Sequence, residues 1–480
     1  MHQKDKTGQK SNSNSFACPV NLKNCFKSSP LLPSPPSNEE SNNQPFKTHF
    51  IYLILATACF AVFYPILFND FQYYWDDQWM VFNEYTEGGL NARNLKKLFM
   101  TNLHGQYAPI NQFVFLLLYS AVGYKAFFFH LTSLLLHTAC VFLVYRCITC
   151  LFALSNGILT NRAIAVACIT SLIFALHPLN VESVAWMSAI KVLLYAFFYL
   201  LATLAFLSFL KKKKFIYYLG ALLLFTLSFG CKEQAVTFPL WLLLIYFMLG
   251  YDFKQRKVWK SLLPFFLLSF VFGLITMSVS ARSEYAMQDL YPVWQRVVFG
   301  CYSLVEYLTK FAFPYKLLYI YPFPIAAGEA IPLWLLIYPT LIFIAVVTLK
   351  SHLLKKPYLF GILFFLIHIA IALHVIPSSR IAIVADRYMY LAMIGLAFII
   401  AYSLVLAIER WQGWMRKTAI LAVACLCLYW GVFSNLRCRE WRDSDTLKKE
   451  FKEIRKTAKS EFKFTHFFVF RVEKKIFLHY

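Results

Sequence analysis

The sequence predicts an all-α polytopic membrane protein, and three observations support this fold class. Of the 480 residues, 59% are hydrophobic and only 15% are charged, whereas soluble globular chains are about half apolar and a quarter charged. The mean hydropathy is +0.55. The apolar residues also form runs of about 20 residues, the length of a helix that crosses a bilayer. Together these features exclude a disordered regulator, a coiled coil and a cytosolic enzyme of one or two domains.

The basic residues outnumber the acidic ones, 47 Lys and Arg against 24 Asp and Glu, which gives a formal net charge of +23. In a soluble chain this excess would suggest nucleic-acid binding. Here the basic residues stand in short runs between apolar stretches, so they are interpreted as topology signals. We therefore expect a lipid bilayer as partner and no nucleic acid. The 12 cysteines show no regular framework and are expected to be buried membrane thiols.

The first segment, residues 1–49, is rich in Ser, Asn, Pro and Lys. Such a composition buries too little apolar surface to fold, so we expect a disordered cytoplasmic N-terminus. The segment is also too long to be the basic leader of a cleaved signal peptide. The apolar run at 50–68 follows it and predicts a first, uncleaved transmembrane helix.

Further apolar runs of spanning length follow this first one. They lie at about 126–146, 163–181, 190–210, 215–231, 234–250, 261–280, 331–349, 358–376, 388–408 and 417–436.

Two more stretches, about 108–122 and 297–313, are ambiguous, because the first is short and the second contains Glu306 and Lys310. If both are amphipathic helices on the outer surface, the main basic clusters fall on the cytoplasmic side, as the positive-inside rule requires. These clusters are Lys211–Lys214, Lys254/Arg256/Lys257/Lys260, Lys350/Lys355/Lys356 and Arg410/Arg416/Lys417.

The sequence therefore predicts about eleven spans, with the N-terminus inside and the C-terminus outside. The transmembrane domain extends over residues 50–436, and a short basic tail over 437–480 follows it. Three polar segments then lie on the outer face: a first loop at 69–125 with membrane-lying helices, a turn at 177–182 and a loop at 377–390. Polar residues in a membrane protein need water, a partner or a function, so the candidate site is sought in these segments.

The first loop contains the adjacent carboxylates Asp76 and Asp77. Because neighbouring carboxylates repel, one of them can have a raised pKa that suits proton transfer near neutrality. The alternative is a solvated turn after a helix, since two adjacent aspartates are not specific to any function.

The turn at 177–182 places His177 and Glu182 just past the end of a predicted span, on the face that also has Asp76 and Asp77. Asp77, His177 and Glu182 offer oxygen and nitrogen donors that could hold a divalent cation. Alternatively, His177 caps the helix that ends before Pro178 and Glu182 pairs with Lys191.

Two further basic residues, Lys232 and Arg387, are predicted on the same face. A cation near a bilayer surface is costly unless it is paired, and a lipid phosphate is an available partner. Arg387 could instead form a salt bridge with its neighbour Asp386.

The order of four motifs resembles the transmembrane part of the tetratricopeptide-repeat-containing protein O-mannosyltransferases and their bacterial relatives, over about residues 50–445. The block from His177 to Trp186, His-Pro-x-x-x-Glu-Ser-Val-Ala-Trp, is its most specific element. The four motifs are Trp75-Asp76-Asp77, Ala175-Leu176-His177-Pro178-Leu179-Asn180-Val181-Glu182-Ser183-Val184-Ala185-Trp186, Lys232-Glu233-Gln234-Ala235-Val236-Thr237-Phe238-Pro239 and Asp386-Arg387-Tyr388-Met389-Tyr390-Leu391.

This resemblance implies a C-type glycosyltransferase that moves a sugar, mannose by family, from a polyprenyl phosphate to a hydroxyl, expected to belong to a protein Ser or Thr. It implies Asp76 as base, with Asp77 and Glu182 as orienting or cation-holding groups. The expected substrate contacts are His177, Lys191, Lys232 and Arg387. The chain would lie in a bacterial inner membrane, or the endoplasmic reticulum membrane of a eukaryote, with its active site on the outer or lumenal face.

The chain departs from the family pattern in three places. Relatives typically read Ser-Gly-Arg-Lys-Asp where this chain has Ser188-Ala189-Ile190-Lys191-Val192, and Cys231 replaces a usual Ser. No 34-residue repeat is found after Ser444. Two alternatives therefore stay open: a transporter or flippase of lipid-linked sugars, and a catalytically inactive membrane scaffold.

Overall fold

The computed structural model describes residues 44–449 except 104, 281–290, 316, 327 and 376–381, and also residue 452. Most of the predicted N-terminal segment, 1–49, and most of the predicted tail, 437–480, lie outside the described residues. Within the described part the chain is almost entirely helical and has no β-strand, only two isolated β-bridges. The predicted all-α class is confirmed.

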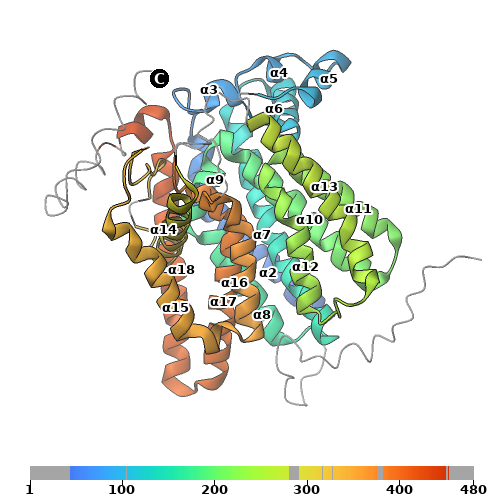
Figure 1. Cartoon of the computed structure of the whole chain (residues 1–480), viewed down its shortest axis with the longest axis vertical. Coiled ribbons are helices and arrows are strands. Elements are labelled where there is room, and N and C mark those ends of the chain that lie inside the picture. The colour runs from blue at the N-terminus through green and yellow to red at the C-terminus, as the bar shows by residue number, and fades with distance from the viewer. Residues whose placement is uncertain are drawn as a thin grey trace, which may run out of the picture.

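Eight helices of the described residues are long and apolar enough to cross a membrane, which makes this a multi-pass membrane protein (Figure 1). Each coincides with one of the predicted spans. They are α2 (Gln44–Phe63), which the 3-10 turn η1 (Tyr64–Phe68) continues, α7 (Ala126–Asn156), α10 (Ile190–Lys212), α13 (Arg256–Ser280), α15 (Ile337–Leu353), α16 (Lys356–Ile369), α17 (Met389–Arg410) and α18 (Gly413–Glu440).

The three other predicted spans are helical but short or bent. The run at 163–181 becomes α8 (Asn161–Leu176), followed after a bend of 56° by η2 (Pro178–Asn180) and α9 (Val181–Ala185). The next two runs become shorter apolar helices. These are α11 (Phe215–Cys231) and α12 (Phe238–Met248), the latter preceded by η4 (Glu233–Thr237).

The first outer loop folds into a cap of short helices at one end of the bundle (Figure 1). Asparagine side chains begin two of them: Asn83 accepts backbone N–H groups at the start of α4, and Asn91 does so for α5. The four helices are α3 (Asp77–Met80), α4 (Glu84–Glu87), α5 (Ala92–Met100) and α6 (Pro109–Val122).

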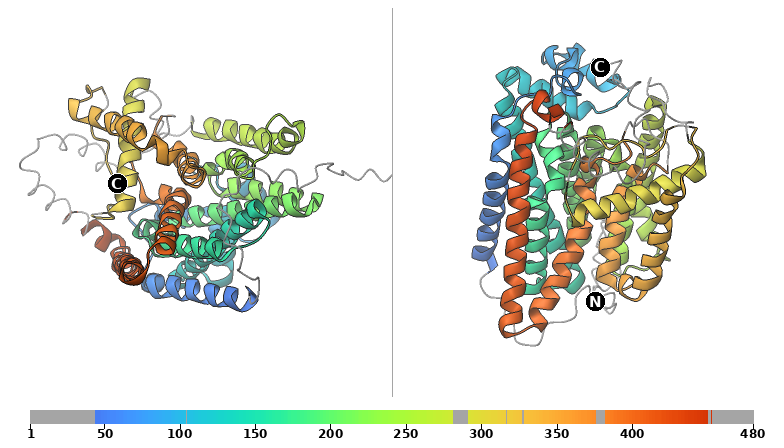
Figure 2. Two further views of the ribbon diagram at one scale, coloured as in Figure 1. Left: turned by 90° about the horizontal axis from the view of Figure 1, so that it is seen from below. Right: turned by 90° about the vertical axis from the view of Figure 1, so that its left-hand side faces the viewer.

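The second ambiguous stretch becomes α14 (Val293–Ala312), which lies crosswise to the long helices (Figure 2). Its buried residues include Val298, Phe299 and Tyr307, whereas Trp294 and Val297 are exposed. The remaining short elements are η3 (Met187–Ala189), η5 (Leu333–Leu336), η6 (Ala370–Leu373) and η7 (Asp386–Tyr388).

The end of α2 and the end of α18 lie together at the cap. The Asn69 side chain donates to the carbonyl of Cys438 at 2.9 Å, and the Asp70 N–H donates to the carbonyl of Arg442 at 2.8 Å. The helix α18 runs past the predicted span end at 436 as far as Glu440. The first four residues of the predicted tail, 437–440, therefore continue α18.

Candidate active site

The three polar segments of the predicted outer face meet at the capped end of the bundle. The loop that contains Asp76 and Asp77 contacts η3, and η7 contacts α9. An ion pair between Glu182 and Arg387 joins the second segment to the third, and hydrogen bonds between Asp77 and Ser188 join the first to η3. Folding therefore gathers side chains that are hundreds of residues apart in sequence.

His177 shapes the bend that follows α8. It ends the helix in an extended conformation, ψ 132°, and Pro178, which has no N–H, begins η2. Its Nδ1 accepts the Leu179 N–H at 3.2 Å, and its Nε2 lies 3.0 Å from the Phe311 carbonyl oxygen. Since one ring nitrogen accepts and the other donates, His177 is a neutral cap whose two nitrogens are both occupied.

Glu182, which the bend directs into the bundle, is only 1% exposed. Its Oε2 accepts the backbone N–H of Arg387 at 2.9 Å, and its Oε1 accepts the guanidinium Nη1 of the same residue. The guanidinium carbon also lies 5.3 Å from the ring centre of Trp186 and 5.2 Å from that of Tyr388. The partner of Glu182 is thus Arg387, not Lys191, and two aromatic faces add cation–π attraction.

Asp386 and Arg387 do not pair with each other. In the 3-10 turn η7 successive side chains point about 120° apart. Asp386 therefore faces Arg437 of α18, with 3.0 Å between Oδ2 and Nη2, while Arg387 faces Glu182.

Asp77 is fully buried and holds the first loop against η3. Its Oδ1 accepts the N–H of Ser188 at 2.9 Å and also the Ser188 hydroxyl, and its Oδ2 accepts the Gln72 N–H at 2.8 Å. Burial raises the pKa of Asp77 to about 7, although these hydrogen bonds favour the ionised form. Both oxygens of Asp77 are thus bonded to groups of the protein.

Asp76 has a different environment although it is the next residue. Its carboxylate is half-buried and, within the described part of the chain, forms no hydrogen bond or ion pair. Burial raises the pKa of Asp76 above its ordinary value, the nearby cations Lys191 and Arg387 lower it, and Glu182 adds to the rise. A carboxylate that has no hydrogen bond among the described residues and lies beside two cations is suited to accept a proton.

Two lysines complete the charged group of side chains. Lys191 is half-buried, and its Nζ donates to Oε1 of Gln106 in the first loop at 2.6 Å. Lys232 is buried at the junction of α11 and η4, and its Nζ lies 5.3 Å from the Tyr388 ring centre. Both therefore lie beside the Arg387 turn or the Asp76 loop, where they could meet an anionic group.

The divalent cation expected at Asp77, His177 and Glu182 stays a prediction, and in this structure the donor atoms of all three side chains are bonded within the protein. Asp77 accepts three hydrogen bonds from Ser188 and Gln72, Glu182 uses both oxygens on Arg387, and His177 uses both ring nitrogens. Among the described residues no group of three His, Cys, Asp or Glu side chains is arranged to hold a metal. We therefore assign no chemical step to a metal.

Aromatic rings from four separate segments line this region. Trp75 lies 5.2 Å from Tyr319 and 6.4 Å from Trp186, and Trp186 stacks on Trp441 at 5.8 Å. Trp75 and Tyr319 are half-buried, whereas Trp186 and Trp441 are buried. The partly accessible pair thus offers an apolar surface next to Asp76.

Sequence reasoning identified the charged residues but missed their partners Ser188, Gln106 and Arg437. A serine or a glutamine has no distinguishing pattern in a single sequence. Arg437 does follow an apolar run directly, at the same end as Asp386, and a buried charge at the end of a span was the sign that could have identified it.

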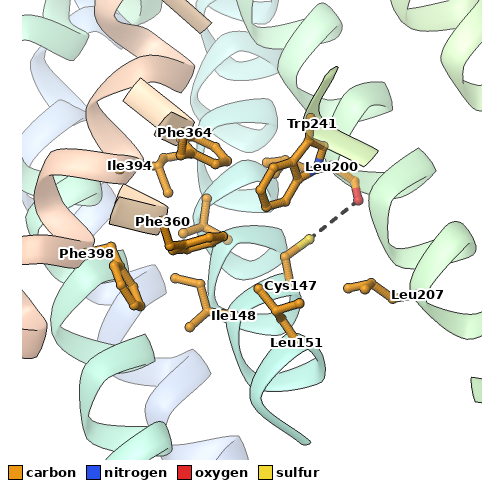
Figure 3. Close-up of a pocket in the computed structure, with 12 residues that line it drawn as sticks. Cys147, Ile148, Leu151, Leu200, Leu207, Trp241, Phe360, Phe364, Ile394 and Phe398 are labelled. Atoms are coloured by element: carbon orange, nitrogen blue, oxygen red, sulfur yellow. Dashed lines mark hydrogen bonds between the residues drawn. The ribbon is translucent and has the colours of Figure 1, made fainter. Parts of the chain in front are cut away.

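A cavity of about 30 Å³ lies deeper in the bundle, among α7, α10, α12, α16 and α17 (Figure 3). The Cys147 thiol donates to the Leu200 carbonyl at 3.6 Å beside it. None of its lining residues is a carboxylate or a basic residue, so the cavity has no part in the candidate site. They are Val144, Cys147, Ile148, Leu151, Leu200, Leu207, Trp241, Phe360, Phe364, Ile394, Gly395 and Phe398.

No protein-family model matches the chain, and no curated protein matches it. The candidate site consequently depends on its own geometry and on the motifs described above.

Proposed function

We propose that the chain is a membrane glycosyltransferase that moves a sugar from a polyprenyl-phosphate donor to a hydroxyl acceptor. Mannose and a protein Ser or Thr are the sugar and acceptor that the motif resemblance implies. The observation that carries the proposal is the gathering of Asp76, Glu182, Lys191 and Arg387 at one end of the bundle.

The proposed reaction is a single displacement. Asp76 takes the proton of the acceptor hydroxyl while its oxygen attacks the anomeric carbon. The bond from that carbon to the phosphate oxygen breaks, so that polyprenyl phosphate leaves and the anomeric centre is inverted. The transition state gains positive charge on the sugar and negative charge on the departing phosphate.

The basic residues would stabilise the departing phosphate. Arg387 uses Nη1 on Glu182, which leaves other guanidinium N–H groups for a second anion. Lys191 would exchange the Gln106 oxygen for a phosphate oxygen, and Lys232 would add a second ammonium. Asp77 supports the base, because its bonds to Ser188 hold the loop in which Asp76 lies.

We further propose eleven crossings, with the site on the outer or lumenal face and the N-terminus in the cytoplasm. They comprise the eight long helices, the bent α8–α9 segment, α11 and α12. Of the last two, α11 packs beside α10 and α12 packs beside α16. A bacterial inner membrane, or an endoplasmic reticulum membrane in a eukaryote, would supply the polyprenyl-phosphate sugar.

Transport of lipid-linked sugars is the rival function. Transporters hold their charged residues near the middle of the bilayer, in broken helices. Here the charged residues of the candidate site lie at one end of the bundle, which favours a surface reaction. A catalytically inactive scaffold is the third alternative, and activity measurements separate all three.

The test supplies the purified full-length chain in nanodiscs with radiolabelled polyprenyl-phosphate mannose and Ser- and Thr-containing peptides. We expect labelled peptide from the wild type and a loss of about 10²-fold or more in Asp76→Asn, the usual contribution of a general base. Asp445→Asn, at an exposed aspartate near the same end of the bundle, is the matched control and should retain full activity.

Undiminished transfer by Asp76→Asn would overturn its role as base. Absence of labelled product from the wild type, together with movement of the donor across liposome membranes, would establish transport instead. If the wild type neither transfers the sugar nor moves the donor across the membrane, the result would support an inactive scaffold.

A further inference from the structure

We infer that Arg437, at the end of α18, is a positioning residue that fixes the turn η7 and, through it, Arg387 of the candidate site. It touches none of the reacting groups of the proposed transfer. Its effect on turnover rests on the proposed function, whereas its effect on the geometry of the site does not.

Arg437 is only 3% exposed and is bonded on three sides. Its Nη2 lies 3.0 Å from Oδ2 of Asp386, and its Nη1 donates to the carbonyl of Leu317 at 2.6 Å and to Glu440 at 3.2 Å. One planar guanidinium thus joins α18, the segment after α14 and the turn η7. A lysine cannot reproduce this, because its ammonium is a point charge without a fixed fork of donors.

Asp386 links Arg437 to Arg387, its neighbour in the turn η7. Its second oxygen, Oδ1, accepts the Tyr321 hydroxyl at 2.9 Å, and the backbone of Tyr321 pairs with Ile383 and Val384. With its neighbour fixed at both oxygens, Arg387 directs its backbone N–H and its guanidinium to Glu182. The orientation of Arg387 therefore depends on the pair between Asp386 and Arg437.

The end of α18 and the residues after it also hold the loop that contains Asp76. The side chain of Gln72 donates to the carbonyl of Trp441 at 2.8 Å, and the Tyr74 N–H donates to the Ser444 hydroxyl at 3.1 Å. The bond from Asn69 to Cys438 and that from Asp70 to Arg442 precede them. Residues 69–74 lead directly into Asp76. The end of α18 and the residues after it therefore hold the Asp76 loop, while Arg437 holds the turn that contains Arg387.

Loss of the ion pair between Asp386 and Arg437 should change the conformation of the turn η7. Removal of Arg437 leaves a buried Asp386 carboxylate without its cation, and an uncompensated buried charge is strongly unfavourable. The turn η7 would then rearrange to hydrate Asp386, which withdraws Arg387 from Glu182. Arg439 offers a matched control, since it lies on the same helix, is exposed and, among the described residues, has Asn435 as its one side-chain partner at 3.4 Å.

The first measurement is hydrogen–deuterium exchange of the full-length protein, which needs no activity. Several backbone N–H groups over 383–388 donate hydrogen bonds, which slow their exchange. Among them are those of Ile383, Ala385 and Arg387. In Arg437→Met we expect their exchange to be at least about 10-fold faster, as the loss of a hydrogen bond to a charged group predicts. Arg439→Met should exchange as the wild type does.

The second measurement is transfer activity. A displaced Arg387 should lower kcat by about 10²-fold, the effect of a misplacement of about 1 Å. The double variant Arg387→Met/Arg437→Met should lose no more than Arg387→Met alone, because Arg437 acts through Arg387. Additive losses would overturn this route of action.

If Arg437→Met fails to enter the membrane, the paired variant Asp386→Asn/Arg437→Met decides, because it buries no lone charge. We expect it to insert and still to exchange faster over 383–388. Exchange equal to the wild type in either inserted variant would overturn the inference. If the wild type transfers no sugar but Arg437→Met speeds exchange in this turn, the positioning role stands and the proposed function fails.

Discussion

At the residue scale, Asp76 and Asp77 have different environments, because among the described residues only the Asp77 carboxylate accepts hydrogen bonds. Asp77 is buried and accepts hydrogen bonds from Ser188 and Gln72, whereas Asp76 is half-buried beside Lys191 and Arg387. A protein interior must satisfy each buried polar group, so the better-bonded carboxylate is the structural one. Asp76, the other carboxylate, is therefore the one that we propose as the base.

Replacement of Asp77 should change the pH dependence of stability. Burial raises its folded-state pKa to about 7, above the ordinary value of 3.8. Between these values unfolding releases a proton, so this group's stabilising contribution is full at low pH and falls as pH rises to about 7. The slope for one proton is at most about 1.4 kcal/mol per pH unit. Asp77→Asn should remove this decline.

The measurement is the thermal unfolding midpoint in detergent between pH 5 and 8. The wild type should lose more stability over this range than Asp77→Asn does, whatever the difference between them at pH 5. Asp445→Asn, at an exposed aspartate, should follow the wild type. If the midpoint falls equally in the wild type and Asp77→Asn, the Asp77 carboxyl does not titrate in this range.

Sequence alone identified the charged residues of the site but not their pairings. An aspartate or arginine next to an apolar run is unusual, so it can be recognised in the sequence as a candidate site residue. Which partner each one meets depends on the tertiary structure: Glu182 lies nine residues before Lys191 in the chain, yet its partner is Arg387. For His177 the sequence left a cation ligand and a helix cap open, and its bonds to Leu179 and Phe311 show the cap.

At the element scale, the contact between α16 and α17 depends on two glycines. A Cβ built on Gly395 would lie 2.9 Å from the backbone N of Phe365 and still closer to the carbonyl of Gly361. Because both obstacles are backbone, no side chain can move aside. The two helices can therefore pack this closely only without side chains at the crossing.

We expect Gly395→Ala to force α16 and α17 apart and to destabilise the protein by about 1–3 kcal/mol, the range for overpacking. Gly220→Ala is the control, since a Cβ there in α11 meets nothing within 4 Å. Thermal unfolding in detergent should show a lower midpoint only for the first variant. An equal midpoint for both would mean that the two helices are further apart than the structure has them.

Apolar length predicted the helices better than it predicted their shape. Every predicted run is helical, but the run at 163–181 is bent at Pro178, where the missing N–H and the His177 cap redirect the chain. The run at 417–436 continues to Glu440, because Arg437 is buried by its pair with Asp386. Hydropathy detects apolar surface and has no term for a cap or a buried ion pair.

At the scale of the whole molecule, charge and architecture agree. The basic clusters Lys211–Lys214, Lys350 with Lys355, and Arg410 with Arg416 lie in connections away from the cap of α3–α6 (Figure 1). The candidate site lies at the capped end. The positive-inside rule places the basic connections in the cytoplasm. The opposite, capped end with the candidate site would then lie on the outer face, as the proposed function requires.

This arrangement predicts that the two ends of the chain are on opposite sides of the membrane. The helix α2 starts away from the cap and α18 ends at it (Figure 2), which requires an odd number of crossings. With tags of different sequence at residues 1 and 480, protease added to sealed right-side-out vesicles should remove only the C-terminal tag. Detergent should then expose the N-terminal tag. Cleavage of both tags without detergent would require an even number of crossings, and cleavage of the N-terminal tag alone would reverse the orientation and place the carboxylates of the site in the cytoplasm.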